Sequence, residues 1–177
     1  MLELRDFSFV HKYFTGEKQE SLLFIIIGIT AIALSIVFFF LIKTNPSFYK
    51  GAAIPLFAIG LIQLVVGYTV YARSDKQRME IAYNLGMEPV QFAKQQEIPR
   101  MQTVMKNFII YRYVEIALAL AGIALFIYFR NNESRLLWKG LGLALAVQAV
   151  LMLGADGFAE KRGKIYVKNL ETVLSPN

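Results

Sequence analysis

The chain has 177 residues, of which 56% are hydrophobic and only 18% are charged, and its formal net charge is +6. Soluble domains carry about 25% charged residues, and disordered chains combine low hydrophobicity with high charge, so the composition excludes disorder and disfavours a soluble domain. The absence of cysteine excludes a disulfide framework and a thiol nucleophile.

The N-terminal segment, residues 1–20, interleaves aromatic and charged side chains. At this spacing Leu4, Phe7, Val10 and Phe14 fall on one face of a helix. A helix with such a face is suited to the plane of the membrane–water interface. The sequence therefore predicts an N-terminal interfacial amphipathic segment that anchors the protein.

Four long apolar runs follow. A helix needs about 20 apolar residues to cross ~30 Å of hydrocarbon, and in lipid a helix pairs all of its own backbone groups. The predicted spans are residues 21–42, 51–72, 107–129 and 136–155. The first run is longer than the apolar region of a cleaved signal peptide and has no small-residue cleavage site after it, so we interpret it as a retained span.

Helical periodicity continues beyond these spans, through the central loop 73–106 and the tail 156–177. Gly86 is predicted to end a helix in the left-handed conformation, and Pro89 and Pro99 are each predicted to start one. Helices extended in this way would be roughly 45–55 Å long at 1.5 Å per residue, which is longer than a membrane is thick. We therefore expect the second, third and fourth helices to project from the membrane as a helical stub.

The predicted fold is an all-α integral membrane protein with an antiparallel bundle of four transmembrane helices. Residues 1–177 form one membrane domain. Thirteen basic residues lie in the N-terminal segment, the central loop and the tail, against five on the other side, four of them in the two short loops and the fifth, Lys139, near the start of the fourth span. Basic residues concentrate on the cytoplasmic side of membrane proteins, so both termini and the stub are expected to be cytoplasmic, in the cytoplasmic (inner) membrane.

Each predicted span carries a stripe of small or polar residues at spacings of three or four. Small residues let helices approach closely in lipid, where no hydrophobic force drives helices together. We interpret the stripes as helix-packing faces, with a ligand groove as the alternative. The packing residues are Gly28, Ala31, Ser35, Gly60, Gly67, Ala119, Gly122, Gly140 and Ala144.

A polar cluster is predicted near the cytoplasmic end of the third and fourth spans. Arg112 and Glu115 are three residues apart on one helix and can pair, and Asp156 would lie at about the same depth on the next helix. Charged residues inside membranes usually face the bundle interior and mark function. The cluster is either a structural clamp or a proton or cation relay. Its further candidate members are Gln63, Tyr68 and Gln148.

No motif for catalysis, metal binding or cofactor binding is found. His11 is the only histidine and has no partner at ligand spacing, and the sequence has no P-loop, nucleophile elbow or dinucleotide fingerprint. The carboxylates also lack the Glu-x-x-His pattern of di-iron bundles. We therefore expect neither enzymatic activity nor a cofactor, and no nucleic-acid recognition module is present.

Three functions remain open on the sequence alone. The first is a non-enzymatic membrane protein that binds another protein at or in the bilayer, as an accessory subunit or as an immunity or inhibitor protein. The second is a small oligomeric transporter or channel that uses Arg112, Glu115 and Asp156. The third is a lipid-modifying membrane enzyme. The expected partners are the lipid bilayer together with a second protein or further copies of the chain.

Overall fold

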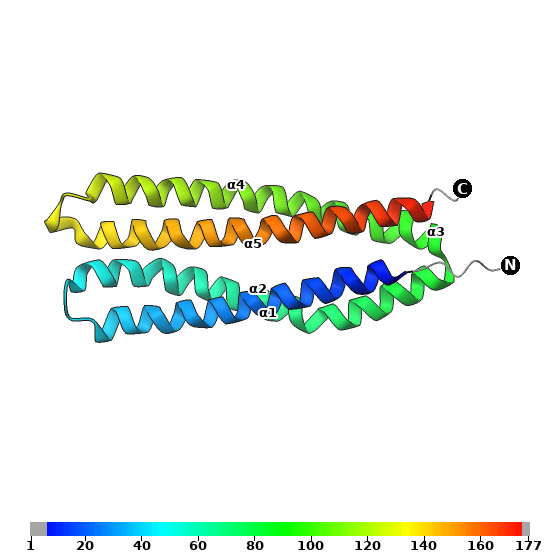
Figure 1. Ribbon diagram of the computed structural model, residues 1–177, viewed down its shortest axis with the longest axis horizontal. Helices are drawn as coiled ribbons and strands as arrows, with labels where there is room; N and C mark the ends of the chain where they lie inside the picture. Colours follow the sequence, from blue (N-terminus) through cyan, green and yellow to red (C-terminus); the bar gives the residue numbers. More distant parts are fainter. Residues whose placement is uncertain (1–6, 175–177) are drawn as a thin grey trace.

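The computed structural model describes residues 7–174 as an all-helical chain (Figure 1). Its long helices are α1 (Ser8–Ile36, continued by a π-helical end, Val37–Leu41), α2 (Pro46–Met87), α4 (Ile98–Phe129) and α5 (Leu136–Leu174). The connections are the short helix α3 (Pro89–Phe92), a π-helical turn (Ala93–Glu97) and a 3-10 turn (Glu133–Arg135). Within the described residues, four helical segments are long and apolar enough to cross a membrane. This confirms the predicted all-α fold with four long apolar helices.

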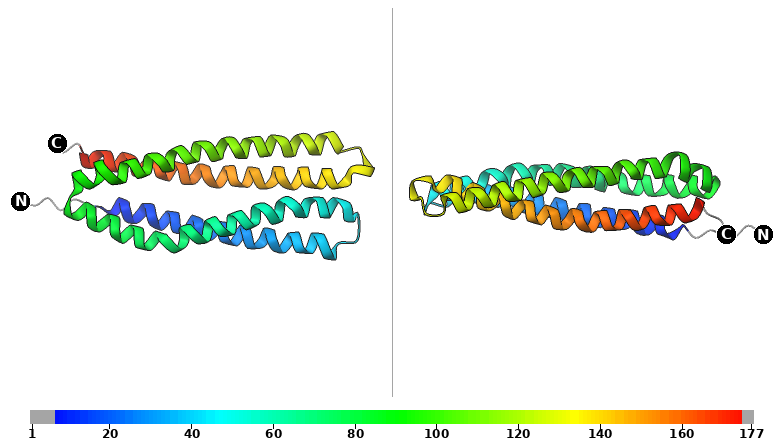
Figure 2. Two further views of the ribbon diagram at one scale, coloured as in Figure 1. Left: turned by 180° about the vertical axis from the view of Figure 1, so that it is seen from behind. Right: turned by 90° about the horizontal axis from the view of Figure 1, so that it is seen from above.

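The helices are arranged as two hairpins that lie side by side (Figures 1 and 2). Helices α1 and α2 form the first hairpin, and α4 and α5 form the second. Helix α5 also packs on α2 and, less extensively, on α1, whereas α4 packs chiefly along α5. Helices α1 and α2 cross near the middle of the molecule, and α2 and α5 run in the same direction (Figure 1). Figure 2 shows that the whole arrangement is flattened.

Glycines bring the helix backbones into direct contact. A Cβ atom added at Gly28 of α1 would lie 2.7 Å from the carbonyl oxygen of Gly60 in α2. One added at Gly122 of α4 would lie 2.7 Å from the carbonyl oxygen of Gly142 in α5. The nine small residues of the predicted stripes are all buried: Gly28, Ala31, Ser35, Gly60, Gly67, Ala119, Gly122, Gly140 and Ala144. The stripes therefore lie where helices meet.

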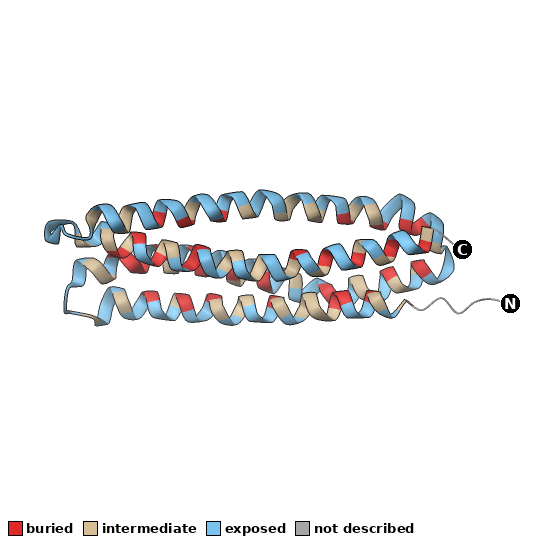
Figure 3. Cartoon of the chain, turned by 45° about the horizontal axis from the view of Figure 1, so that its top comes forward, coloured by how far each residue is buried: buried red, intermediate tan, exposed pale blue. Residues whose placement is uncertain are grey.

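The end of the molecule where α1 begins and α5 ends has a core of its own, and we call this end the stub (residues 8–20, 73–106 and 156–174). Figure 3 shows buried positions recurring along the inward faces of the helices there. The buried core is aromatic and aliphatic and consists of Val10, Tyr13, Phe14, Ile81, Leu85, Phe92, Ala93, Met101, Tyr166 and Leu170. Segments far apart in the sequence therefore pack together outside the predicted spans.

The N-terminal segment differs from the expected interfacial arm. Helix α1 begins at Ser8 and runs without a break into the first predicted span, so residues 8–20 form no separate segment. Val10, Tyr13 and Phe14 are 0%, 4% and 1% exposed inside the stub core. No proline interrupts this stretch, and packing against the other helices of the stub removes its apolar face from water. Leu4 lies outside the described residues.

The connection between α2 and α4 corrects one prediction and bears out two others. Gly86 lies inside α2 rather than at a left-handed end, and among the described residues only Asn45 has a positive φ. Pro89 starts α3, and Pro99 lies in the first turn of α4. A π-helical turn directly precedes Pro99. A proline ring clashes with the carbonyl four residues earlier in a regular helix, and the wider turn accommodates it.

Candidate functional site

Arg112 pairs across the interface between α4 and α5 rather than along its own helix. Its Nη2 atom forms an ion pair with Oε2 of Glu160, and Lys164 Nζ lies 2.7 Å from Oε1 of the same carboxylate. The Glu160 side chain is only 9% exposed. The expected pairing of Arg112 with Glu115 is therefore wrong, because α5 presents an acidic side chain directly to the guanidinium.

Glu115 faces into the α4–α5 interface and is 2% exposed. Neither of its carboxylate oxygens meets a hydrogen-bond donor among the described residues. It lines a cavity of about 130 Å³ whose walls are Phe108, Arg112, Glu115, Leu153, Asp156, Gly157 and Glu160. The carboxyl groups of Glu115 and Asp156 are close enough to interact directly. The structure thus brings Arg112, Glu115 and Asp156 together and adds Glu160, which was not among the expected members.

The other three candidates lie apart from this cavity. Tyr68 is 67% exposed and points away from the helix interfaces. Gln63 and Gln148 are 3% and 2% exposed, and the Oε1 atom of each lacks a hydrogen-bond partner within residues 7–174. None of the three lines the cavity that holds Glu115. Of the six predicted members, Arg112, Glu115 and Asp156 therefore form the cluster. Gln63 and Gln148 are buried elsewhere, and Tyr68 is exposed.

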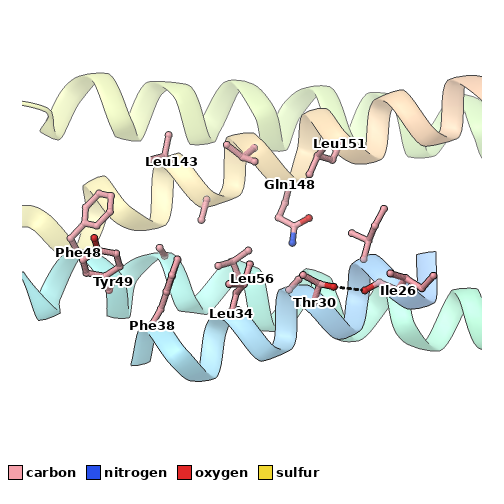
Figure 4. Close-up of a pocket in the computed structure, with 15 residues that line it drawn as sticks. Ile26, Thr30, Leu34, Phe38, Phe48, Tyr49, Leu56, Leu143, Gln148 and Leu151 are labelled. Atoms are coloured by element: carbon pink, nitrogen blue, oxygen red, sulfur yellow. Dashed lines mark hydrogen bonds between the residues drawn. The ribbon is translucent and has the colours of Figure 1, made fainter. Parts of the chain in front are cut away.

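Gln148 instead lines a larger, mostly apolar groove between α1, α2 and α5 (Figure 4). The groove has a volume of about 470 Å³. In Figure 4 the amide of Gln148 points from α5 toward the first hairpin. The hydroxyl of Thr30, on the opposite wall, donates to the carbonyl of Ile26 at 2.8 Å and is thereby satisfied. The groove therefore contains one buried amide oxygen, that of Gln148, without a hydrogen-bond partner among the described residues, in a wall of aliphatic and aromatic side chains.

The stub contains a second polar network, centred on the buried carboxylate of Glu97. Arg100 donates from Nε to Oε2 at 2.8 Å and from Nη2 to Oε1 at 2.7 Å. The hydroxyl of Tyr166 donates to Oε1 at 2.7 Å. Tyr166 stacks on Tyr13 with ring centroids 4.2 Å apart, and the Arg100 guanidinium lies 5.7 Å from the ring centroid of Phe14. Glu97 is therefore a charge that is buried but fully partnered.

This environment perturbs the titration of the stub. Burial, followed by the charge of Glu17, raises the pKa of Tyr13 to about 12. Burial and the adjacent Glu97 carboxylate raise the pKa of Tyr166 as well. Burial lowers the pKa of Arg100, but the hydrogen bond and charge of Glu97 outweigh burial and raise it above the ordinary value. Burial also raises the pKa of the Glu17 carboxyl.

Ion pairs join α1 to the other helices of the stub. Arg162 of α5 pairs with Glu20, and Lys18 pairs with Asp75 of α2. The Ser74 hydroxyl of α2 lies 3.2 Å from Oε2 of Glu17. These contacts hold residues 17–20 of α1 against α2 and α5.

The stub network was not predicted from the sequence. Its central acid, Glu97, forms a hydrogen bond with a residue 69 positions away. One signal was available: Ala93, Glu97 and Met101 recur every four residues, and all three are buried. A charged residue in the middle of such an apolar stripe indicates a buried, partnered charge.

The described residues contain no group of three His, Cys, Asp or Glu side chains arranged to hold a metal ion. The imidazole Nε2 of His11 lies 3.4 Å from the hydroxyl of Thr15, one turn away on an exposed surface. No known family model, curated protein or solved structure matches the chain.

Proposed function

We propose that this chain is a non-enzymatic protein of the cytoplasmic membrane that acts by binding another protein at its stub. The proposal is carried by an apolar surface on the outer side of α2 and α3, here called the stub face: Met79, Tyr83, Met87 and Val90. Their exposed fractions are 63%, 68%, 67% and 42%. The α2 members are four residues apart, so they lie on one side of the helix.

The opposite side of the same helix segment is already packed. Ile81 and Leu85 are 5% and 0% exposed in the stub core. A surface helix normally carries polar residues on the side that faces away from its core. Here this side carries methionine and tyrosine, flanked by the exposed charges of Lys76 and Glu80. Methionine adapts to irregular partner surfaces, and tyrosine is enriched among the residues that dominate binding energy.

Lipid does not account for this face. The second predicted span ends at residue 72, so at 1.5 Å per residue Met79 lies roughly 10 Å, and Met87 roughly 22 Å, beyond the hydrocarbon edge. The headgroup layer adds only about 5–8 Å on each side. The stub face therefore lies in water in the proposed orientation, which supports a protein as its occupant. An accessory-subunit role and an immunity or inhibitor role both fit such a face.

Site-specific photocrosslinking tests this proposal. A benzoylphenylalanine side chain replaces Tyr83 on the stub face. The matched control replaces Tyr128, a residue that is 81% exposed near the end of α4 that lies away from the stub. We expect irradiation of the native membrane to join Tyr83→benzoylphenylalanine to a single second polypeptide, identified by mass spectrometry, which the Tyr128 variant does not capture. Adducts of Tyr83 with lipid alone, or with no polypeptide, contradict the proposal. An adduct of Tyr83→benzoylphenylalanine with a second copy of the chain would show that the stub face binds the chain itself, as in a homo-oligomer, and would contradict a different protein as its partner.

The buried carboxyl of Glu115 beside Asp156 favours one other candidate, a small transporter or channel. Beyond this site α4 and α5 close together, since a Cβ at Gly122 would lie 2.6 Å from the backbone nitrogen of Ala146. A path along this interface is therefore blocked, and transport would need several copies. Proton or cation flux in proteoliposomes that Glu115→Gln abolishes would support transport, and flux that the variant leaves unchanged would remove this site from the mechanism.

A further inference from the structure

The cavity between α4 and α5 has an unbalanced set of charges. Among the described residues, the cations that pair with an acid of this cavity are Arg112 and Lys164, and both bind the same carboxylate, that of Glu160. Glu115 and Asp156 are left with each other and with no cation among the described residues. The local arrangement therefore lacks one positive charge.

The adjoining helix does not supply it. The charged side chain of α1 that acts on Asp156 is Glu20, which is itself acidic. Glu20 forms an ion pair with Arg162, so that guanidinium is already engaged. A neighbouring negative charge adds to the imbalance at Asp156 rather than relieving it.

Glu115 is 2% exposed and lines the cavity, and both of its oxygens lack a donor within the described part of the chain. An ionised carboxylate that is buried without a donor or a counter-ion is strongly disfavoured. Two carboxyl groups that share a site do not both ionise readily, because the like charges repel. A single proton held between them turns one group into a hydrogen-bond donor for the other. We propose that Glu115 and Asp156 form a proton-binding site that holds one shared proton where the membrane spans meet the stub.

The cavity has an open wall at Gly157 and is closed where α4 and α5 touch. A Cβ added at Gly157 would meet no atom within 4 Å, so this wall is open. Toward the loop end, the backbones of α4 and α5 touch at Gly122 and Gly142. The volume of about 130 Å³ can hold a few water molecules, each of which occupies about 30 Å³ in the liquid. Protons therefore reach the pair through the open wall at Gly157.

Loss of the shared proton places two negative charges between α4 and α5. The same two helices carry Met101 and Tyr166 into the stub core, so repulsion at the cavity weakens the base of the stub. The contact between α4 and α5 is thus strongest while the pair holds its proton and weakens as the pH rises through the loss of that proton. The proton-binding site goes beyond partner binding, because it makes the contact between α4 and α5, the helices that support the stub, depend on protonation.

Infrared spectroscopy of the protein in lipid nanodiscs tests the site directly. We expect a protonated-carboxyl stretching band that disappears as the pH is raised and that is missing from both Glu115→Gln and Asp156→Asn. The matched control is Glu133→Gln in the exposed 3-10 turn, which keeps the band. Glu17 of the stub, whose pKa is raised by burial, stays in every variant and cancels in the difference spectra.

Three results would overturn the site. The first is a band that both variants retain, and the second is the lack of any titrating band that the variants change. The third is a titration in sodium chloride that differs from that in choline chloride, which would show that a metal cation supplies the charge. If the neutral variants unfold, Glu115→Asp keeps two carboxyl groups and is expected to shift the band. A band that Glu115→Asp leaves unmoved equally contradicts the assignment.

Discussion

The close contact of α4 with α5 predicts that two chemically identical substitutions have different effects. In Gly122→Ala the new Cβ lies 2.6 Å from the backbone nitrogen of Ala146 and 2.7 Å from the carbonyl oxygen of Gly142. In Gly154→Ala the new Cβ meets no atom within 4 Å. Both glycines lie inside long helices, so both variants gain the same helix propensity, about 1 kcal/mol.

The difference in free energy of unfolding between the two variants therefore isolates the cost of packing the added methyl group. The atoms that clash with Gly122→Ala belong to the backbone of α5 and cannot rotate aside, so the helices must separate. Overpacking of this kind costs about 1–3 kcal/mol. A gap of about 0.5–1 Å forfeits a quarter to a half of the dispersion energy of the facing atoms. We expect Gly154→Ala to be more stable than Gly122→Ala by about 1–3 kcal/mol.

The assay is reversible unfolding in mixed detergent micelles, followed by circular dichroism, with both variants measured beside the native chain. Gly28→Ala repeats the test in the first hairpin, where the new Cβ would lie 2.7 Å from the carbonyl oxygen of Gly60. Equal free energies of unfolding for Gly122→Ala and Gly154→Ala would refute the close contact. So would a Gly122→Ala variant that is more stable than Gly154→Ala.

Three further predictions concern the stub. Tyr166→Phe removes a donor from the buried carboxylate of Glu97 and should lower the free energy of unfolding by about 1.5–3 kcal/mol, whereas an unchanged thermal melt would mean that water replaces the hydroxyl. Because Tyr13 holds its proton up to about pH 12 in the folded state but only to about pH 10 when unfolded, its contribution is complete below pH 10 and is lost between pH 10 and 12. Tyr13→Phe should therefore lose less stability than the native chain over that interval, and parallel melting curves would contradict this. Met101→Ala, at a residue 0% exposed, should cost about 2–5 kcal/mol, whereas Met79→Ala, at a residue 63% exposed, should change stability by no more than about 0.5 kcal/mol; equal losses in chemical unfolding would place Met79 in the core.

The helices themselves were predictable because local physics determines them. The length and polarity of the four apolar runs define four long helices, and Pro46, Pro89 and Pro99 occupy first turns, where a missing N–H is not costly. The stripes of small residues were also visible, because a spacing of three or four places residues on one helix face. These features depend on neighbours within one or two helical turns.

The pairing of side chains across helices was not predictable in the same way. Arg112 has an acidic neighbour one turn away in Glu115, but the register of α4 against α5 gives it Glu160 instead. That register depends on which glycines meet, here Gly122 and Gly142, and a single sequence does not state it. The N-terminal segment was misplaced for a related reason: its apolar face fits a membrane surface and a helical core equally well, and only the other helices of the stub decide between them.

Both proposals require that the four helices cross a membrane and leave the stub on the cytoplasmic side. The natural chain has no cysteine, so single cysteines can report this directly. The measurement is labelling of Glu80→Cys on the stub and Ser134→Cys in the 3-10 turn, both exposed positions, with a membrane-impermeant maleimide. We expect right-side-out vesicles to label only Ser134→Cys, and inside-out vesicles to label only Glu80→Cys. Labelling of both positions from the same side of the membrane would contradict the account.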